Sequence, residues 1–351
     1  MNRRTIHWHR TLVALLVFAC AIQGALALTA TWTGDGPTDN YTDLDNWVGN
    51  NLPCNTGSVT FEVTIPADEG LVVMDVPDCT VATLALGMND TFRVLAGNTY
   101  VVDGAADIEG IVDNDGGTFL APVGTFPGCK AQLFDDAGGL IDIAAASYCS
   151  TGLTYAGGTG TVTFTTDLMT SSDPGSVIDL SELLTIDASY PPNSNDYNRQ
   201  QIVASNGGSV DLSSVTSVTV PASYSDWLRF IVSDATSTIQ LNSLDTVQSA
   251  GTGRGYFDAT AGTLALPSLA TVDRGIFRSA AGGAIDAGPL ATVTDTTFDI
   301  SGGSSFTESG TSSTYSSTGL TFAGSTSTLT YTTDLMTSSD PGSTLDLSSV
   351  V

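Results

Sequence analysis

Histidine is almost absent from this sequence of 351 residues. The two histidines, His7 and His9, both lie close to the amino terminus, in a segment that we expect to be removed. The rest of the chain therefore has no imidazole to act as a general base or to ligate zinc. This absence excludes Ser-His-Asp triads and most zinc sites from the candidate functions.

Positive charge is also scarce, with 10 Lys and Arg against 37 Asp and Glu and a formal net charge of −27. Three of the cations fall within the first ten residues, before an apolar run at 11–22 and a small-x-small site at Ala25–Ala27. This order is typical of a secretory signal peptide, so we expect residues 1–27 to be cleaved and the mature chain to begin at Leu28. The mature chain then carries a formal charge of −30, which repels nucleic acid and anionic membranes.

Long hydrophobic runs are missing after residue 28, so the sequence predicts no transmembrane segment in the mature chain. We expect the protein to be secreted or held at the cell surface. A lipoprotein signal at Val17–Cys20 is the alternative, and it fits less well because Phe18 occupies its second position.

A helical period of 3.6 residues is also lacking from the mature chain. Short alternating runs of four to six residues follow one another instead, and Gly, Asn and Asp interrupt them about every ten residues. This pattern predicts an all-β fold made of many short strands.

One unit of the chain occurs twice. Residues 148–181 and 315–348 share 26 of 34 positions without a gap, at an offset of 167 residues. Each copy contains a strand, a Ser-Asp-Pro-Gly turn (172–175 and 339–342) and a second strand. Such duplication indicates a repeat architecture. Because the sequence ends at Val351, inside the copied unit, we expect it to be part of a longer protein or a truncated gene product.

A shorter phrase, apolar-x-Leu-x-x-Leu/Val, recurs through the second half of the chain, with a weaker copy at its fifth occurrence. Its first residues, here called the anchors, are Ile178, Val210, Ile239, Leu264, Ile285 and Leu345. The first five anchors are separated by 32, 29, 25 and 21 residues. A constant core phrase with a variable period is expected from stacked coils whose loops differ in length. The sequence therefore predicts a right-handed parallel β-helix.

Two segments resemble known families. The pattern W-x-G…N-W…G…P…V-x-F within residues 31–66 resembles the N-terminal segment of large exported bacterial surface proteins built as right-handed parallel β-helices. This resemblance implies an N-terminal cap over residues 28–66, followed by coils over 67–351. The phrase L-x-L-P-S-L-x-T-V at 264–272 is similar to repeats of receptor L domains and, more loosely, to leucine-rich repeats. A leucine-rich-repeat-like solenoid is the alternative fold, although the Asn ladder of that fold is missing.

The mature chain contains four cysteines, Cys54, Cys79, Cys129 and Cys149. The first and second pairs are 25 and 20 residues apart, each about one coil. Residues one coil apart lie about 4.8 Å from each other, within the reach of a disulfide. We therefore predict Cys54–Cys79 and Cys129–Cys149 bridges. The second copy of the duplicated unit has Ser316 where the first has Cys149, and the same offset places Thr296 opposite Cys129, as expected for residues lost as a pair.

Arginines occur ten or eleven residues before four of the anchors, at Arg199, Arg229, Arg254 and Arg274. Aromatic residues accompany them, and Tyr197 and Trp227 lie in polar surroundings. Stacked coils would bring these arginines into a ladder on one face. The ladder predicts a binding surface for an anionic or uronic polysaccharide, with arginines on carboxylates and rings on sugars. The alternative interpretation is that each arginine pairs with acids of its own or the next coil.

A second ladder is acidic. Aspartates follow four anchors directly, at Asp179, Asp211, Asp286 and Asp346. Carboxylates stacked at strand spacing repel one another unless a cation bridges them, so calcium is a possible ligand. The sequence predicts no other cofactor and no defined metal site.

No catalytic constellation is evident in the sequence. We therefore expect a non-catalytic structural or adhesive β-helix module, with extracellular polysaccharides or surface proteins as its partners. A polysaccharide lyase or glycoside hydrolase on the same scaffold is the alternative, because such enzymes use aspartates, Ca²⁺ and a basic residue. A fragment without activity of its own is the third possibility.

Overall fold

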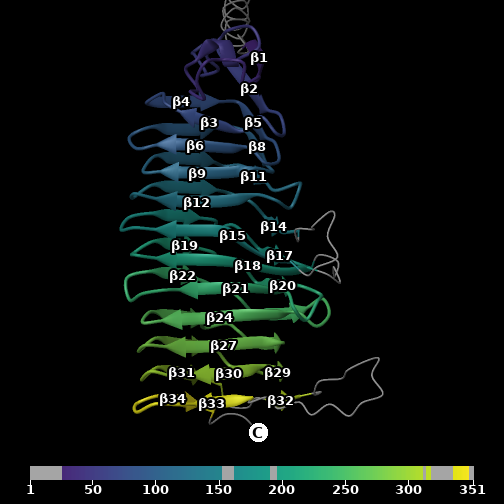
Figure 1. Ribbon diagram of the computed structural model, residues 1–351, viewed down its shortest axis with the longest axis vertical. Helices are drawn as coiled ribbons and strands as arrows, with labels where there is room; N and C mark the ends of the chain where they lie inside the picture. The colour runs from purple at the N-terminus through teal and green to yellow at the C-terminus, as the bar shows by residue number, and fades with distance from the viewer. Residues whose placement is uncertain (1–25, 152–161, 190–195, 311–313, 318–334, 348–351) are drawn as a thin grey trace, which may run out of the picture.

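The chain forms a rod of stacked strands in the computed structural model, which describes residues 26–151, 162–189, 196–310, 314–317 and 335–347. All strands that pair in these ranges pair in parallel, with partners about one coil away in sequence. The rod extends from β1 at one end to β34 at the other (Figure 1). Strands β2 to β34 divide into eleven coils of three strands each, one strand on each of three faces, in the described part of the chain.

The first face is one sheet of eleven strands. It contains β3 (Leu71–Met74), β6 (Thr91–Leu95), β9 (Ile111–Asp115), β12 (Gln132–Asp136), β15 (Val162–Ser172), β18 (Asp196–Ser205), β21 (Trp227–Val232), β24 (Arg254–Thr260), β27 (Gly275–Ala280), β30 (Thr297–Ile300) and β33 (Met336–Ser338).

The second face is a sheet of seven strands followed by a sheet of four. The seven are β4 (Asp78–Val81), β7 (Thr99–Val102), β10 (Thr118–Ala121), β13 (Leu140–Ile143), β16 (Val177–Asp179), β19 (Ser209–Asp211) and β22 (Thr238–Gln240). The four are β25 (Thr263–Leu266), β28 (Ala284–Ala287), β31 (Ser305–Glu308) and β34 (Thr344–Asp346).

The third face is a sheet of five strands followed by one of seven. The five are β1 (Leu26–Thr31), β2 (Val59–Ile65), β5 (Thr83–Leu86), β8 (Ala105–Ile108) and β11 (Val123–Thr125). The seven are β14 (Ser147–Cys149), β17 (Thr185–Asp187), β20 (Ser217–Val220), β23 (Thr246–Ser249), β26 (Thr271–Asp273), β29 (Thr292–Thr294) and β32 (Thr314–Ser316). A 3-10 helix, η1 (Leu44–Asn46), lies between β1 and β2.

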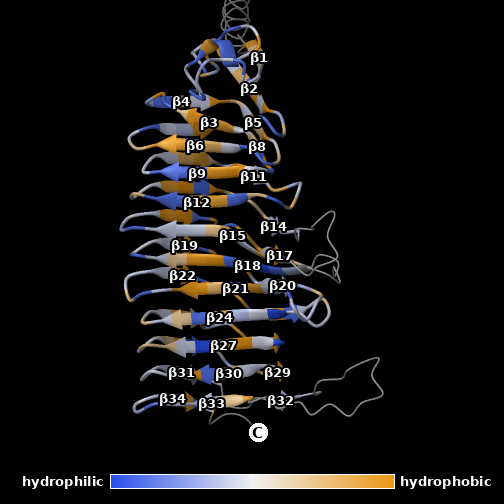
Figure 2. Ribbon diagram, in the orientation of Figure 1, coloured by the Kyte–Doolittle hydropathy of each residue, from blue (hydrophilic) through white to orange (hydrophobic). Residues whose placement is uncertain are grey.

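These faces confirm the predicted all-β parallel β-helix, and the leucine-rich-repeat alternative is not needed to describe it. Alternate side chains of each strand point into the rod, as the buried Leu228, Phe230 and Val232 of β21 do. Hydrophobic and hydrophilic residues are interspersed along the strands in Figure 2. A single coil cannot bury its apolar face alone, so each coil depends on the coils above and below it. Among the described residues, no helix is long and apolar enough to cross a membrane.

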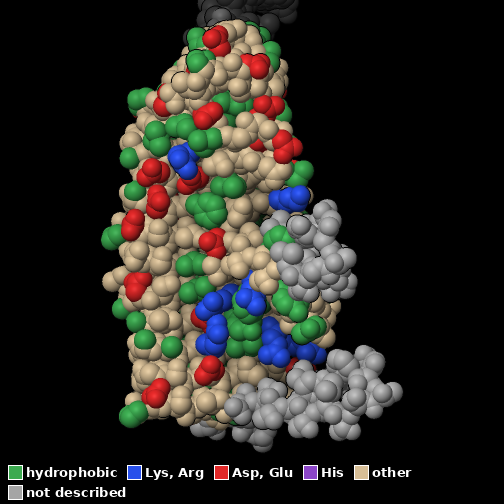
Figure 3. Space-filling view, in the orientation of Figure 1, with side chains coloured by type: hydrophobic (Ala, Val, Ile, Leu, Met, Phe, Trp, Pro, Cys, Tyr) green, Lys and Arg blue, Asp and Glu red, His purple; other side chains and the backbone are tan. Residues whose placement is uncertain are grey.

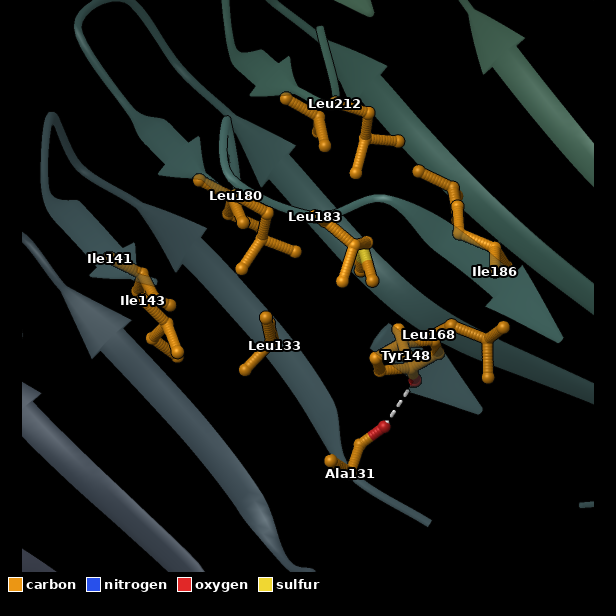
Figure 4. Packing of buried hydrophobic residues seen from close by; sticks show 14 of the residues in the cluster. Ala131, Leu133, Ile141, Ile143, Tyr148, Leu168, Leu180, Leu183, Ile186 and Leu212 are labelled. Carbon is orange, nitrogen blue, oxygen red and sulfur yellow. Dashed lines mark hydrogen bonds between the residues drawn. The ribbon is translucent and has the colours of Figure 1, made fainter. Parts of the chain in front are cut away.

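The recurring phrase marks the position where each coil leaves its second face. Ile178, Leu180 and Leu183 are fully buried, and Figure 4 shows Leu180 and Leu183 inside the rod. Between these two leucines the chain turns, and the Leu183 amide donates to the carbonyl of Leu180. The anchors stack as predicted, with Ile178, Val210 and Ile239 aligned on successive strands. The phrase therefore encodes a strand end and a corner with inward-facing leucines.

The two copies of the duplicated unit occupy equivalent places in their coils, as far as they are described. Strands β15 and β33 both belong to the first face, and β16 and β34 to the second. Their Ser-Asp-Pro-Gly turns share a backbone conformation, with φ of 76° at both Asp173 and Asp340. The segments 152–161 and 318–334 of the two copies lie outside the described residues.

Aromatic side chains of the N-terminal segment pack over the first coils. The rings of Trp32 and Trp47 meet edge to face with centroids 5.0 Å apart, and Tyr41 contacts Trp47 at 4.8 Å. Tyr41 also reaches Phe92 and Tyr100 in the coils below. The tryptophans on which the family resemblance rests are thus buried core residues of this end. Of the predicted signal peptide, residues 1–25 lie outside the described ranges, and Leu26 and Ala27 begin β1.

Both predicted disulfides are present. Cys54 and Cys79 have Cα atoms 5.1 Å apart, and those of Cys129 and Cys149 are 4.7 Å apart. In each pair, backbone hydrogen bonds join the same two segments, from Asn55 to Thr80 and from Thr151 to Cys129. The bridges therefore link neighbouring coils.

Reduction of the disulfides should lower the free energy of unfolding by about 3 kcal/mol per bridge, because each bridge restricts the unfolded chain. Guanidinium unfolding with and without reductant measures the change. The double variant Cys129→Ser, Cys149→Ser removes one bridge by mutation. Its loss of unfolding free energy should equal the loss caused by reductant in a variant that retains the Cys129–Cys149 bridge and lacks the Cys54–Cys79 bridge. Identical unfolding curves for oxidised and reduced protein would contradict this expectation.

Candidate binding surface

Basic side chains gather beside hydrophobic ones on the lower half of the first face (Figure 3). Strands β18, β21 and β24 lie side by side there, and the pairing aligns Arg199 with Trp227 and Trp227 with Arg254. All three side chains are half-buried and point outward, because their neighbours in the strands point into the core. One outward column thus carries arginine, tryptophan and arginine on successive coils.

Three of the four predicted arginines, Arg199, Arg229 and Arg254, lie on this face, and the prediction that the four form one ladder is wrong. Arg229 lies two residues further along β21 and aligns with Gln201 and Tyr256. Arg274 lies before β27 with φ of 59°, and its Nη2 is 3.3 Å from Asp295 Oδ2. The turns between each arginine and its anchor differ in length. Arginines at similar sequence separations from their anchors therefore do not align with one another on neighbouring strands.

We define the arginine–aromatic cluster as Arg199, Trp227, Arg229, Arg254, Tyr256, Asp258 and Arg278. Ring contacts connect four of its members, Arg199, Trp227, Tyr256 and Arg278. The guanidinium carbon of Arg199 lies 4.6 Å from the ring centroid of Trp227, and Trp227 meets Tyr256 edge to face at 4.8 Å. The guanidinium of Arg278 lies over the Tyr256 ring at 4.9 Å. A guanidinium over an aromatic face is attracted by the electron-rich ring.

Asp258 is the one carboxylate within the cluster. Its side chain is only 4% exposed and forms ion pairs with both Arg229 and Arg278. Arg278 donates from Nε to Oδ1 at 2.8 Å and from Nη2 to Oδ2 at 2.7 Å, and Arg229 donates from Nε to Oδ2. These hydrogen bonds to Asp258 raise the pKa of Arg278, against the effect of burial. Burial raises the pKa of Tyr256, so its phenol stays neutral at physiological pH.

The pairing of arginines with acids is therefore only partial. Arg229, Arg274 and Arg278 have aspartate partners, as the alternative interpretation expects. Arg199 and Arg254 form no ion pair with any residue that the structure describes.

Tyr197 lies at the edge of this surface. It is half-buried and aligns with Thr163 of β15, outside the ring contacts that connect the cluster.

Two cluster members, Arg278 and Asp258, were not among the residues singled out from the sequence. A signal for Asp258 was available, since it follows Arg254 by four residues on the same outward side of β24. Arg278 occupies an outward position of β27, whereas Arg274 lies in the turn before that strand. Asp258 aligns with Arg278 on the neighbouring coil, and Arg278 aligns with Asp299. Opposite charges in one register of adjacent coils indicate a cross-strand ion pair.

The predicted acidic ladder is present only in part. Asp179 and Asp211 align on β16 and β19, and Asp142 on β13 extends the column. Asp286 and Asp346 belong to a second column, where Thr307 separates them.

Local hydrogen bonds use some of these carboxylates. Asp179 accepts from the Ser181 amide, and Asp211 accepts from the Ser213 amide. Burial, followed by repulsion from Asp179 and Glu182, raises the pKa of Asp142. Across the described ranges, no three His, Cys, Asp or Glu side chains converge as a metal site would require.

Comparison of the chain with protein-family models, with curated proteins and with solved structures found no match. The interpretation of the arginine–aromatic cluster therefore rests on its own geometry.

Proposed function

We propose that this protein is a non-catalytic extracellular module whose rigid β-helix presents the arginine–aromatic cluster to an acidic polysaccharide. The observation that carries this proposal is the cluster itself. It gathers four of the seven cations of the predicted mature chain, two of them without an acid partner in the described residues, on a chain with 37 acids. Guanidinium groups bind carboxylates and sulfates through paired N–H donors.

Several features support an extracellular setting. The sequence begins with the pattern of a secretory signal, and two disulfides join neighbouring coils. Disulfides persist in oxidising compartments outside the cytosol. The resemblance of the N-terminal segment to exported surface proteins points in the same direction.

The arrangement of charges favours binding over catalysis. Glycosidases place two carboxylates on either side of the scissile bond. The cluster has one carboxylate, Asp258, which is buried and held by two arginines. Asp299, the next acid in that column, lies on the far side of Arg278. A lyase or hydrolase on this scaffold remains the alternative proposal, and the same experiment distinguishes it.

The test is a panel of immobilised polysaccharides, with and without calcium, scored for retention of the mature chain and for new chain ends. We expect retention on polygalacturonate and on sulfated dextran, and none on neutral dextran. Raised salt should release the protein, since exposed charges are screened. Arg199→Ala together with Arg254→Ala should lower affinity about tenfold or more.

The matched control is Arg93→Ala, which removes an arginine that is paired with Asp113 in an earlier coil. This variant should be retained like the wild type. New reducing or unsaturated ends would show an enzyme and overturn the proposal. Absence of both retention and cleavage would leave a structural rod with a protein partner.

A further inference from the structure

Two arginines of the cluster, Arg229 and Arg278, are tethered by one buried acid. Asp258 receives three hydrogen bonds from Arg229 and Arg278 and is almost inaccessible to solvent. The arginine side chains are 29% and 36% exposed. The carboxylate therefore lies beneath two guanidinium groups that still reach the surface.

Some N–H donors of these two guanidinium groups are not used within the protein. Each guanidinium carries five N–H donors. Arg278 directs Nε and Nη2 toward Asp258, and Arg229 directs Nε toward it. Neither guanidinium makes another hydrogen bond to a residue in the described ranges. Nη1 of Arg278 and both Nη groups of Arg229 are thus available to a ligand.

Each aromatic ring of the cluster already contacts an arginine side chain. The guanidinium of Arg199 covers a face of Trp227, and that of Arg278 covers a face of Tyr256. Rings that hold guanidiniums in this way orient them, because the cation keeps its plane near the ring. Each of these rings thus has a guanidinium over it, and the cluster is suited to recognising charge.

We propose that Arg229 and Arg278 form a site for one oxyanion group, carboxylate or sulfate, of an acidic glycan, and that Asp258 is the positioning residue of this site. This inference rests on the proposed function and specifies its chemistry. Two guanidiniums fixed by a shared carboxylate lose little freedom on binding, which favours affinity. The ligand is recognised through its anionic groups, so neutralising those groups should abolish binding.

Asp258 allows a test that separates positioning from simple charge attraction. Asp258→Asn raises the charge of the cluster by one. If the cluster attracts polyanions only through net charge, this variant binds more tightly. If Asp258 positions the two arginines, it binds more weakly in spite of the added charge. Asp299→Asn is the matched control, because Asp299 is exposed beside Arg278 and its removal adds the same charge.

The experiment measures dissociation constants of the full mature chain for polygalacturonate, for its methyl ester and for sulfated dextran at one salt concentration. We expect about tenfold weaker binding for Asp258→Asn and unchanged or tighter binding for Asp299→Asn. Methyl esterification should remove binding in every variant. Sulfated dextran compared with polygalacturonate identifies which oxyanion the site prefers.

Two outcomes would overturn the inference. One is Asp258→Asn binding as tightly as the wild type, and the other is retention of the neutral methyl ester. Circular dichroism checks whether the Asp258→Asn variant folds. If it does not fold, the Arg278→Lys variant provides the test instead. This variant keeps the charge but loses the fork, so it should bind about fivefold more weakly, and unchanged binding would refute the site. A wild type that binds no polyanion would instead refute the proposed function.

Discussion

Replacement of Phe277 by alanine should lower the free energy of unfolding by about 3–5 kcal/mol. Phe277 is fully buried in a column of stacked rings inside the rod. Its centroid lies 5.2 Å from that of Phe257 and 5.4 Å from that of Phe298, with nearly parallel planes. Phe306 contacts it from the second face. Alanine would leave a cavity between three rings that the short strands cannot close.

The measurement is guanidinium unfolding combined with amide hydrogen exchange. Because each coil contacts its neighbours only, protection should fall most in β24, β27 and β30. Phe277→Leu keeps most of the volume and should cost less than about 1.5 kcal/mol. An alanine variant that loses less than about 1 kcal/mol would show that the ring column is not a principal source of stability.

Replacement of Asp135 by asparagine should stabilise the protein at alkaline pH. Asp135 points into the rod, 1% exposed, and accepts a hydrogen bond of 2.5 Å from Asn114 Nδ2. Burial raises the pKa of Asp135 to about 7, although the hydrogen bond from Asn114 opposes the shift. The other carboxylate oxygen and Asn114 Oδ1 have no hydrogen-bond partner. In the Asp135→Asn variant, the new side-chain amide can donate a hydrogen bond to Asn114 Oδ1.

The direction of the pH dependence follows from the raised pKa. A carboxyl whose pKa is higher in the folded than in the unfolded state favours folding when protonated, so its contribution is complete below pH ~4. That contribution is lost as pH rises through about 7, the pKa of folded Asp135. The variant does not titrate there, so its advantage over wild type should grow by about 2–4 kcal/mol between pH 4 and pH 8.

Denaturant titrations of both proteins across this pH range measure the difference. Asp103→Asn is the control, because Asp103 is exposed and the same chemical change there should have little effect. A constant difference between wild type and Asp135→Asn at all pH values would show that Asp135 does not titrate in the folded protein.

The sequence predicted those features that depend on a recurring pattern. The fold follows from the anchors and from short alternating strands, since Ile178, Val210 and Ile239 have to stack to be buried. The disulfides follow from separations of about one coil. Neither the fold nor the disulfide pairing depends on knowing the lengths of individual loops.

Features that depend on register across a turn could not be predicted. Arg229 lies outside the column of Arg199 and Arg254 because five residues separate β21 from β22, whereas two separate β24 from β25. Inward and outward sides are also ambiguous in a short strand. In β12, Leu133 and Asp135 point inward while Phe134 is half-buried, so the larger apolar residue does not decide the side.

The length of the rod depends on the number of coils and hardly on the number of residues. Paired positions on the first face are 20 residues apart between β24 and β27 and 34 apart between β15 and β18. Each of these steps nevertheless advances the rod by one strand spacing, about 4.8 Å. Insertions at the corners therefore widen the molecule without lengthening it. The distance from the N-terminal end to the arginine–aromatic cluster is thus set by the number of coils between them. Loops in those coils can change in length without changing this distance.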